Sequence, residues 1–334
     1  MSWRKLAFKV IALAGLTAAT GCAVIDRRAT EREAVAEANT PPIGEFVELA
    51  DGRRVHAFVE GTGPDLVLIH GASGNLRDFT FSLVDRLTDR YRVIAFDRPG
   101  MGYTDRADPS YDTPGNNGSE PVREQARMLQ LAADQLGVTD PVVLGHSFGG
   151  AVALAWALER PQDTAALVVL SGASNPWPGG LGVSYSVPNS SLGGRIAVPL
   201  VSALLSTKTL NSMVDGVFAP QSAPAGYAEY LGADLALRRD SLRANARQVS
   251  SLKPQLAQMV PLYPDLPMPV EILHGEADDT VPPTIHAIPL SSQIPNANLV
   301  LLPGIGHMPH HVAQDDVEAA IDRAATRAGL RPTR

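Results

Sequence analysis

The sequence contains a single cysteine, Cys22, among its 334 residues. No disulfide can therefore form within the chain, and cysteine thiolates cannot assemble a zinc site in it. Positive charge is also scarce, because 28 lysines and arginines stand against 35 acidic residues, giving a formal net charge of -7. A chain without an excess of basic residues lacks an extended surface for neutralising phosphates, so we expect no nucleic-acid partner.

Apolar residues make up 45% of the sequence and charged residues only 19%. This composition provides enough material for one large core. The first apolar run, residues 10–19, follows the basic residues Arg4 and Lys5. It is shorter than the roughly 20 residues that a membrane-spanning helix needs, so residues 1–21 are predicted to be an export signal peptide.

The residues that lead to the cysteine, Ala19-Thr20-Gly21-Cys22, resemble the bacterial lipobox, although Ala19 takes a place where leucine is more common. The resemblance implies cleavage before Cys22, lipidation of that residue, and an exported lipoprotein anchored to a membrane. The alternatives are an ordinary signal peptide, with a soluble periplasmic or secreted protein, and a simple apolar N-terminal anchor. The polar stretch that follows predicts a tether over residues 22–44.

From residue 45 onward, short apolar runs alternate with stretches of helical composition. An antiparallel hairpin is expected first, because runs at 45–49 and 54–59 flank the turn signal Asp51-Gly52. Continuous apolar runs separated by helices are typical of a parallel sheet covered on both faces. Such runs lie at 66–69, 93–96, 142–144, 167–170, 270–273 and 299–302. We therefore predict an α/β fold with a mostly parallel eight-stranded sheet flanked by helices.

The interval between residues 171 and 270 has no clear buried strand and is too long for a simple connection. Its composition is helical at about 196–213 and 226–259. We predict a helical cap over residues 174–265, at the carboxyl edge of the sheet, where open parallel sheets bind ligands. The core would then comprise residues 45–173 and 266–334.

Ser147 lies in the segment Gly145-His146-Ser147-Phe148-Gly149, between an apolar run and a helical stretch. A serine with small neighbours on a tight strand-to-helix turn is typical of a nucleophile elbow. The pentapeptide alone is a weak signal, because glycine and serine also form ordinary turns. In this context we predict that Ser147 is a nucleophile, with a structural turn as the alternative.

A serine nucleophile needs a base within hydrogen-bonding reach, and histidine is the usual one. His307 follows the last predicted strand in Gly304-Ile305-Gly306-His307, where a loop can bring it to the serine. The other histidines are predicted to be structural or to flank the site: His56, His70, His146, His274, His286, His310 and His311. The spacing of the last two could suggest a metal site, but no carboxylate in the sequence completes a known ligand pattern, so we expect no metal.

Together these motifs resemble the α/β-hydrolase fold-1 family over about residues 45–327. They are His70-Gly71, Asp97-Arg98-Pro99-Gly100-Met101-Gly102, the elbow, the turn at Asp278 and Gly306-His307. The resemblance implies a serine hydrolase whose catalytic residues occur along the chain in the order nucleophile, acid, base. Epoxide hydrolases and dehalogenases of this family use an aspartate at the elbow, which disfavours them here. Residues 97–102 are expected to form a structural loop.

The resemblance also assigns the supporting groups of the site. The family pattern Gly-x-x-Asp followed by Val-Pro matches Asp278, rather than Glu276 or Asp279, as the acid that orients the base, and a turn or helix cap is its alternative role. Two backbone N–H groups are expected to stabilise an oxyanion. One belongs to Phe148, directly after the nucleophile at a helix N-terminus. The other belongs to Ala72, which follows the His-Gly pair.

These residues predict hydrolysis of a carboxylic ester or a similar acyl compound, without a cofactor. Carbon–carbon bond hydrolysis and perhydrolysis use the same groups, and the fold can also serve as a non-catalytic ligand-binding module. The oligomeric state is left open.

The substrate is expected to be a small apolar molecule held by the cap. Apolar residues of one cap helix would line its pocket: Ile196, Val198, Leu200, Val201, Leu204 and Leu205. Trp177 and the nearby Gly179, Gly180 and Gly182 would form an entrance. The alternative is that this apolar stripe simply packs the cap onto the sheet.

Overall fold

The computed structural model describes residues 3–113, 116, 118–181 and 183–332. Eight strands of this described chain form one sheet, in the order β1-β2-β4-β3-β5-β6-β7-β8. The first two pairs are antiparallel and the others are parallel. The mostly parallel eight-stranded sheet predicted from the sequence is therefore confirmed. The strands are β1 (Glu45–Glu48), β2 (Arg54–Glu60), β3 (Asp65–Ile69), β4 (Arg92–Phe96), β5 (Val142–His146), β6 (Ala166–Leu170), β7 (Val270–Gly275) and β8 (Ala297–Leu302).

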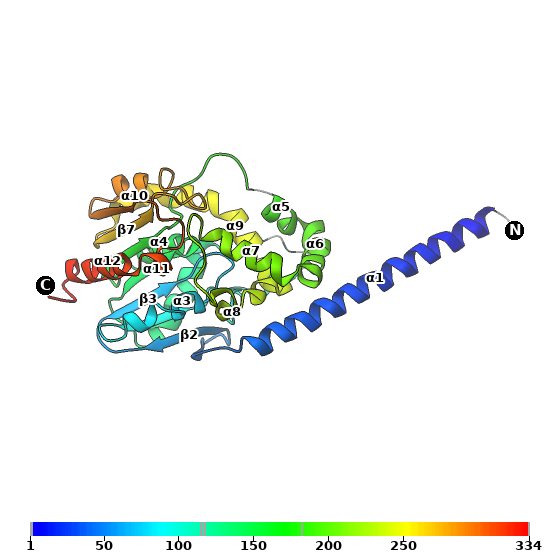
Figure 1. Cartoon of the computed structure of the whole chain (residues 1–334), viewed down its shortest axis with the longest axis horizontal. Helices are drawn as coiled ribbons and strands as arrows, with labels where there is room; N and C mark the ends of the chain where they lie inside the picture. Colours follow the sequence, from blue (N-terminus) through cyan, green and yellow to red (C-terminus); the bar gives the residue numbers. More distant parts are fainter. Residues whose placement is uncertain (1–2, 114–115, 117, 182, 333–334) are drawn as a thin grey trace.

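The central strands are mostly apolar, and helices cover both faces of the sheet (Figure 1). One face packs against α3 (Val122–Gln135), α4 (Phe148–Glu159) and α10 (Ala287–Gln293). The other packs against α12 (Gln314–Arg327) and the segment with α2 (Arg77–Thr80) and η1 (Val84–Arg86). Every residue of β3, β5, β6 and β7 is buried as a result. The short elements η2 (Pro109–Asp112) and α11 (Pro309–Val312) lie in connections.

Between β6 and β7 the regular secondary structure of the described chain is all helical, in the region where the sequence predicts a cap. Its elements are α5 (Val183–Asn189), α6 (Ser191–Leu204), α7 (Thr207–Val217), α8 (Tyr227–Leu231), η3 (Ala233–Leu237), α9 (Arg239–Met259) and η4 (Val260–Asp265). The long helix expected at 196–213 is divided into α6 and α7, and Ser206 caps the start of α7 with its side chain. This division allows the two helices to contact different parts of the molecule.

Helix α1 (Trp3–Asn39) is one continuous helix, and its N-terminal part extends away from the rest of the molecule (Figure 1). Residues 22–39, expected to belong to a tether, are thus helical and run beside the cap. Ion pairs join the two: Arg239 contacts Glu33 at 2.8 Å, and Arg238 contacts Glu37 at 3.0 Å. Within the residues that the structure describes, no helix is long and apolar enough to cross a membrane.

Candidate active site

Ser147 lies in the turn between β5 and α4. Its backbone has φ 54° and ψ −120°, a conformation that costs a residue other than glycine roughly 1–3 kcal/mol. Two glycines allow the turn to close. A Cβ atom on Gly145 would lie 2.1 Å from the carbonyl oxygen of Gly149, and one on Gly149 would lie 2.1 Å from that of Ile69. Strand and helix therefore approach more closely at this turn than larger residues would permit.

The structure brings Ser147, His307 and Asp278 together, as the sequence analysis expects. Ser147 Oγ lies 2.9 Å from His307 Nε2, and His307 Nδ1 lies 2.7 Å from Asp278 Oδ2. Because an ionised carboxylate can only accept, the proton of this second hydrogen bond belongs to Nδ1. The lone pair of Nε2 then faces the serine hydroxyl. Asp279, the neighbouring candidate, is exposed.

Asp278 follows β7, and both oxygens of its carboxylate have partners. Oδ1 accepts from the backbone N–H groups of Thr280 and Val281 at 2.9 and 2.8 Å, while Oδ2 faces His307 and lies 3.2 Å from His274 Nε2. Burial alone would raise the pKa of Asp278, but the contacts with His274 and His307 hold it well below its usual range. The carboxylate is therefore ionised and fixed in orientation.

The loop after β3 brings backbone atoms next to the nucleophile. A Cβ atom on Gly71 would lie 3.0 Å from Ser147 Cβ and 3.5 Å from Ser147 Oγ. Ala72 borders the cavity beside Ser147. Phe148 begins α4, and the first N–H groups of a helix have no acceptor within it. Both residues predicted to donate to an oxyanion thus lie beside Ser147.

Arg98 is fully buried and holds this loop in place. Its Nε donates to the His70 carbonyl at 3.0 Å and its Nη2 to the Gly71 carbonyl at 3.1 Å. The guanidinium also lies 4.3 Å from the centre of the Phe148 ring. Burial lowers the pKa of Arg98 to about 9, so the group remains charged at neutral pH. These contacts fit the structural role expected of residues 97–102.

A small cavity of about 110 Å³ opens beside Ser147. Most of its lining is apolar, and its large apolar side chains come from α7, the residue after it, α8 and the loop before α11: Val214, Val217, Phe218, Leu231 and Met308. The hypothesis that α6 forms the wall is wrong for this cavity, because no described residue of α6 lines it. Ile196, Leu200 and Leu204 are exposed instead, and Trp177 packs against the main core. Gly182 lies outside the described residues.

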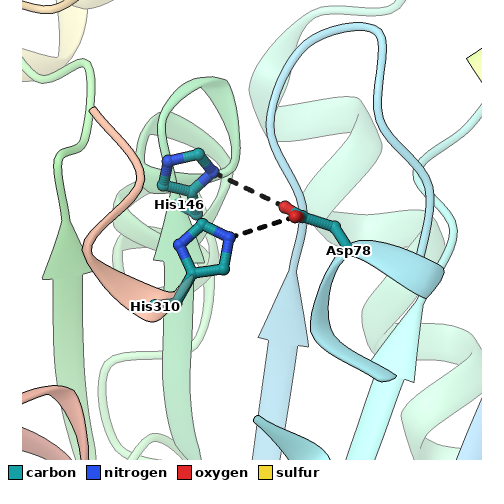
Figure 2. Close-up of side chains that lie close together, drawn as sticks. All are labelled: Asp78, His146 and His310. Atoms are coloured by element: carbon teal, nitrogen blue, oxygen red, sulfur yellow. Dashed lines mark hydrogen bonds and ion pairs between the residues drawn. The ribbon is translucent and has the colours of Figure 1, made fainter. Parts of the chain in front are cut away.

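Asp78 and Tyr227 are polar residues of the same cavity, and neither was predicted from the sequence. Oδ1 of Asp78 accepts hydrogen bonds from the Tyr227 hydroxyl at 2.6 Å, from His310 Nε2 at 3.1 Å and from His311 Nε2 at 2.9 Å. Figure 2 shows Asp78 facing His310 and also His146, whose Nδ1 lies 3.8 Å from Oδ2. We call these five residues the Asp78 cluster.

The Asp78 cluster could not be found from local sequence patterns. Asp78 is 232 positions away from His310, and only the adjacent histidines at 310 and 311 gave any signal. Burial alone would raise the pKa of Asp78, but His310 and His311 hold it well below its usual range. Burial lowers the pKa of His310 to about 4. The cluster is therefore a buried carboxylate surrounded by imidazole and phenol groups.

A sequence profile of the alpha/beta hydrolase family matches residues 66–320. The chain is 34% identical over 271 residues to the polyketide synthase ThaQ of Burkholderia thailandensis, a match that covers 79% of this chain but only 12% of that protein. It is 29% identical to the magnesium-chelatase 30 kDa subunit of Rhodobacter capsulatus, covering 78% of this chain and 86% of the relative. It is 28% identical to the 2-hydroxymuconate semialdehyde hydrolase of Pseudomonas putida, covering 80% and 89%.

Solved structures share the fold at lower sequence identity. An esterase from Exiguobacterium antarcticum superposes with a TM-score of 0.64 at 17% identity, covering 84% of this chain and 99% of the esterase. A bacterial membrane phospholipase A has a TM-score of 0.64 at 18% identity, and that match covers 99% of this chain and 100% of the phospholipase. The profile match spans most of the chain and agrees with the sheet order and the elbow described above. This chain therefore belongs to the alpha/beta hydrolase family.

Proposed function

We propose that this protein is a serine hydrolase that cleaves a carboxylic ester or a related acyl compound. One observation carries the proposal, namely the continuous line of hydrogen bonds from Asp278 through His307 to Ser147 Oγ, with lengths of 2.7 and 2.9 Å. A serine hydroxyl is a poor nucleophile at neutral pH, and this arrangement supplies the base that activates it. The chemistry needs no cofactor.

In this mechanism Ser147 Oγ attacks the carbonyl carbon while its proton moves to His307 Nε2. Asp278 stabilises the imidazolium that forms. The carbonyl oxygen becomes an oxyanion that accepts hydrogen bonds from the N–H groups of Ala72 and Phe148, and losing one such donor costs about 2.7–4 kcal/mol in comparable enzymes. His307 then protonates the leaving alkoxide. Water, activated by the same histidine, releases the acyl group from the serine.

Carbon–carbon bond hydrolysis is the second candidate, because the 2-hydroxymuconate semialdehyde hydrolase is among the relatives with high coverage. Perhydrolysis and non-catalytic ligand binding are the remaining alternatives. Serine at position 147 disfavours the dehalogenase and epoxide hydrolase chemistry of this family, which uses aspartate there. A panel of esters, ketones with a cleavable carbon–carbon bond, and acyl donors with peroxide separates these activities. Turnover of none of them, without labelling of Ser147, would favour a binding module.

The substrate is proposed to carry a short, uncharged acyl group. The cavity beside Ser147 is mostly apolar and measures about 110 Å³, far less than the roughly 300–1,000 Å³ of pockets for drug-sized ligands. Methylene groups gain free energy by leaving water for such a lining. The cavity is too small, however, to take up a long chain without rearrangement.

The protein is also proposed to be an exported lipoprotein, anchored to a membrane through Cys22. This proposal rests on the lipobox resemblance and on the exposure of Cys22 on α1. After cleavage, residues 22–39 would remain as a helix that contacts the cap through Glu33 and Glu37. The lipid would therefore be connected to the cap by a short, ordered segment.

Replacing Ser147 with alanine (Ser147→Ala) should abolish ester turnover, lowering kcat by on the order of 10⁶-fold. The change removes the nucleophile and adds no buried polar group, so the fold should persist. We would measure hydrolysis of a p-nitrophenyl ester, labelling by a fluorophosphonate probe, and circular dichroism. Turnover or labelling that survives in the folded variant would contradict the assignment.

Asp278→Asn should lower kcat by about 10⁴-fold, because an amide at this position favours the wrong tautomer of His307. Asp279→Asn is the matched control and should leave kcat within about twofold of wild type, since surface substitutions usually have small effects. Steady-state kinetics of both purified variants test this difference. Equal losses would show that the orienting carboxylate has been assigned incorrectly.

For p-nitrophenyl esters, kcat/KM should rise with acyl length and then fall within the short chains. Each buried methylene is worth roughly 0.8 kcal/mol, or about fourfold, until the cavity is full. Val217→Ala enlarges the cavity and should move the maximum to a longer ester. Val201→Ala, a half-buried valine of α6 outside the cavity, is the control and should leave the maximum unchanged. A flat profile, or a shift in the control alone, would refute this pocket.

Cys22→Ser should release the protein from the membrane fraction into the soluble fraction, because it removes the only proposed lipid attachment site. Fractionation and immunoblotting of cells that express the full chain would show the change. Metabolic labelling with a fatty-acid analogue should give a signal in wild type alone. Unchanged membrane association together with an unlabelled wild type would reject the lipoprotein proposal.

A further inference from the structure

The two oxygens of the Asp78 carboxylate have very different surroundings. Oδ1 accepts three hydrogen bonds, from Tyr227, His310 and His311. Oδ2 accepts none from any residue that the structure describes, and its close neighbour is His146 Nδ1 at 3.8 Å. This separation is too long for a hydrogen bond. Asp78 is nevertheless only 3% exposed and lines the cavity beside Ser147, so Oδ2 belongs to a largely buried carboxylate.

The position of the proton on the His146 ring determines whether Oδ2 faces an N–H group or a lone pair. His146 Nε2 lies 2.9 Å from the carbonyl oxygen of His307. A carbonyl oxygen only accepts, so the proton is on Nε2 and Nδ1 of the neutral ring carries a lone pair. That nitrogen is buried and has no hydrogen-bond partner among the described residues. A lone pair and a carboxylate oxygen therefore face each other, an arrangement that a cation between them would stabilise.

His310 provides a third candidate metal ligand beside the same carboxylate. Figure 2 shows the rings of His146 and His310 converging on Asp78 from one side, with their ring centres 4.4 Å apart. One donor atom from each of Asp78, His146 and His310 lies within 4.8 Å of the other two. At metal–ligand distances of roughly 2.0–2.2 Å, two ligands of a tetrahedral ion lie about 3.3–3.6 Å apart. His310 Nε2 lies 3.1 Å from Asp78 Oδ1, and His146 Nδ1 lies 3.8 Å from Asp78 Oδ2, so each imidazole nitrogen is near one oxygen of the same carboxylate at a separation close to this range.

We propose that Asp78, His146 and His310 bind a divalent transition-metal ion of the zinc class beside Ser147. Two imidazoles and one carboxylate suit such ions, whereas calcium and magnesium prefer oxygen ligands. Coordination through His310 Nε2 requires that the proton of this ring move to Nδ1, which has no hydrogen-bond partner among the described residues, so the ion would replace the hydrogen bond from His310 to Oδ1. Tyr227 and His311 would keep the carboxylate oriented through Oδ1, as outer partners of metal ligands do. No metal was expected from the sequence, because no carboxylate completes a known ligand pattern there, but the fold supplies Asp78 from a distant segment. The proposal does not depend on the hydrolase activity.

The test uses the full chain without an affinity tag, stripped with a chelator and then titrated with Co²⁺ or Zn²⁺. Wild type should show visible ligand-field absorption with Co²⁺ and should retain about one equivalent of Zn²⁺ after desalting, measured by elemental analysis. Asp78→Asn and His310→Gln should each weaken binding by at least about tenfold. Asp279→Asn, an exposed aspartate, and Ser147→Ala should both bind as wild type does.

Circular dichroism of each variant separates loss of the site from loss of the fold, and His310→Gln replaces Asp78→Asn where the latter fails to fold. The proposal is overturned when folded wild type retains no metal and shows no Co²⁺ absorption. It is equally overturned when the folded Asp78 or His310 variant binds metal with unchanged affinity, because the ion would then lie elsewhere. Hydrolysis of esters is not needed for any of these measurements.

Discussion

The backbone conformation of Ser147 is the constraint on which the rest of the site depends. A φ of 54° is unfavourable for serine and must be maintained by its surroundings. Ser147 N–H donates to the Leu170 carbonyl at 3.1 Å, and the Ser147 carbonyl accepts from Ala173 N–H at 3.0 Å. Both partners belong to β6 or the residues after it. The turn is therefore held by the adjacent strand, and its geometry depends on the pairing of β5 with β6.

The same edge of the sheet brings the base and its acid to the serine. Strands β5, β7 and β8 are parallel, so the loops after them meet at their carboxyl ends. Close backbone packing fixes two of these loops against each other. A Cβ atom on Gly275 would lie 2.3 Å from the Gly306 carbonyl oxygen, and Ala277 N–H donates to the Ile305 carbonyl at 2.9 Å. The short Asp278–His307 hydrogen bond follows from this contact between loops, more than from the side chains alone.

The sheet could be predicted from its apolar runs. Ser147, Asp278 and His307 could be predicted because each lies in a short motif that follows an apolar strand. Prediction from the sequence failed for the cavity, because α6 and α7 are both amphipathic or apolar and only tertiary packing decides which one faces the serine. It also missed Asp78, whose partners are distant in sequence and whose own short helix has no distinctive pattern. The alanine, glutamate and arginine of residues 22–39 favour a helix, but the ion pairs from Glu33 and Glu37 to the cap join residues that are distant in sequence, which local composition does not reveal.

His146 connects the nucleophile turn to the Asp78 cluster. The elbow requires small residues at 145 and 149, but it places no such limit on position 146. The ring there donates from Nε2 to the His307 carbonyl at 2.9 Å while its Nδ1 faces Asp78. A cation bound between His146 and Asp78 would restrain the orientation of the His146 ring. Through its hydrogen bond to the His307 carbonyl, that ring would also restrain the backbone of His307. The position of His307 thus depends on Asp278 through its side chain and on His146 through its main chain.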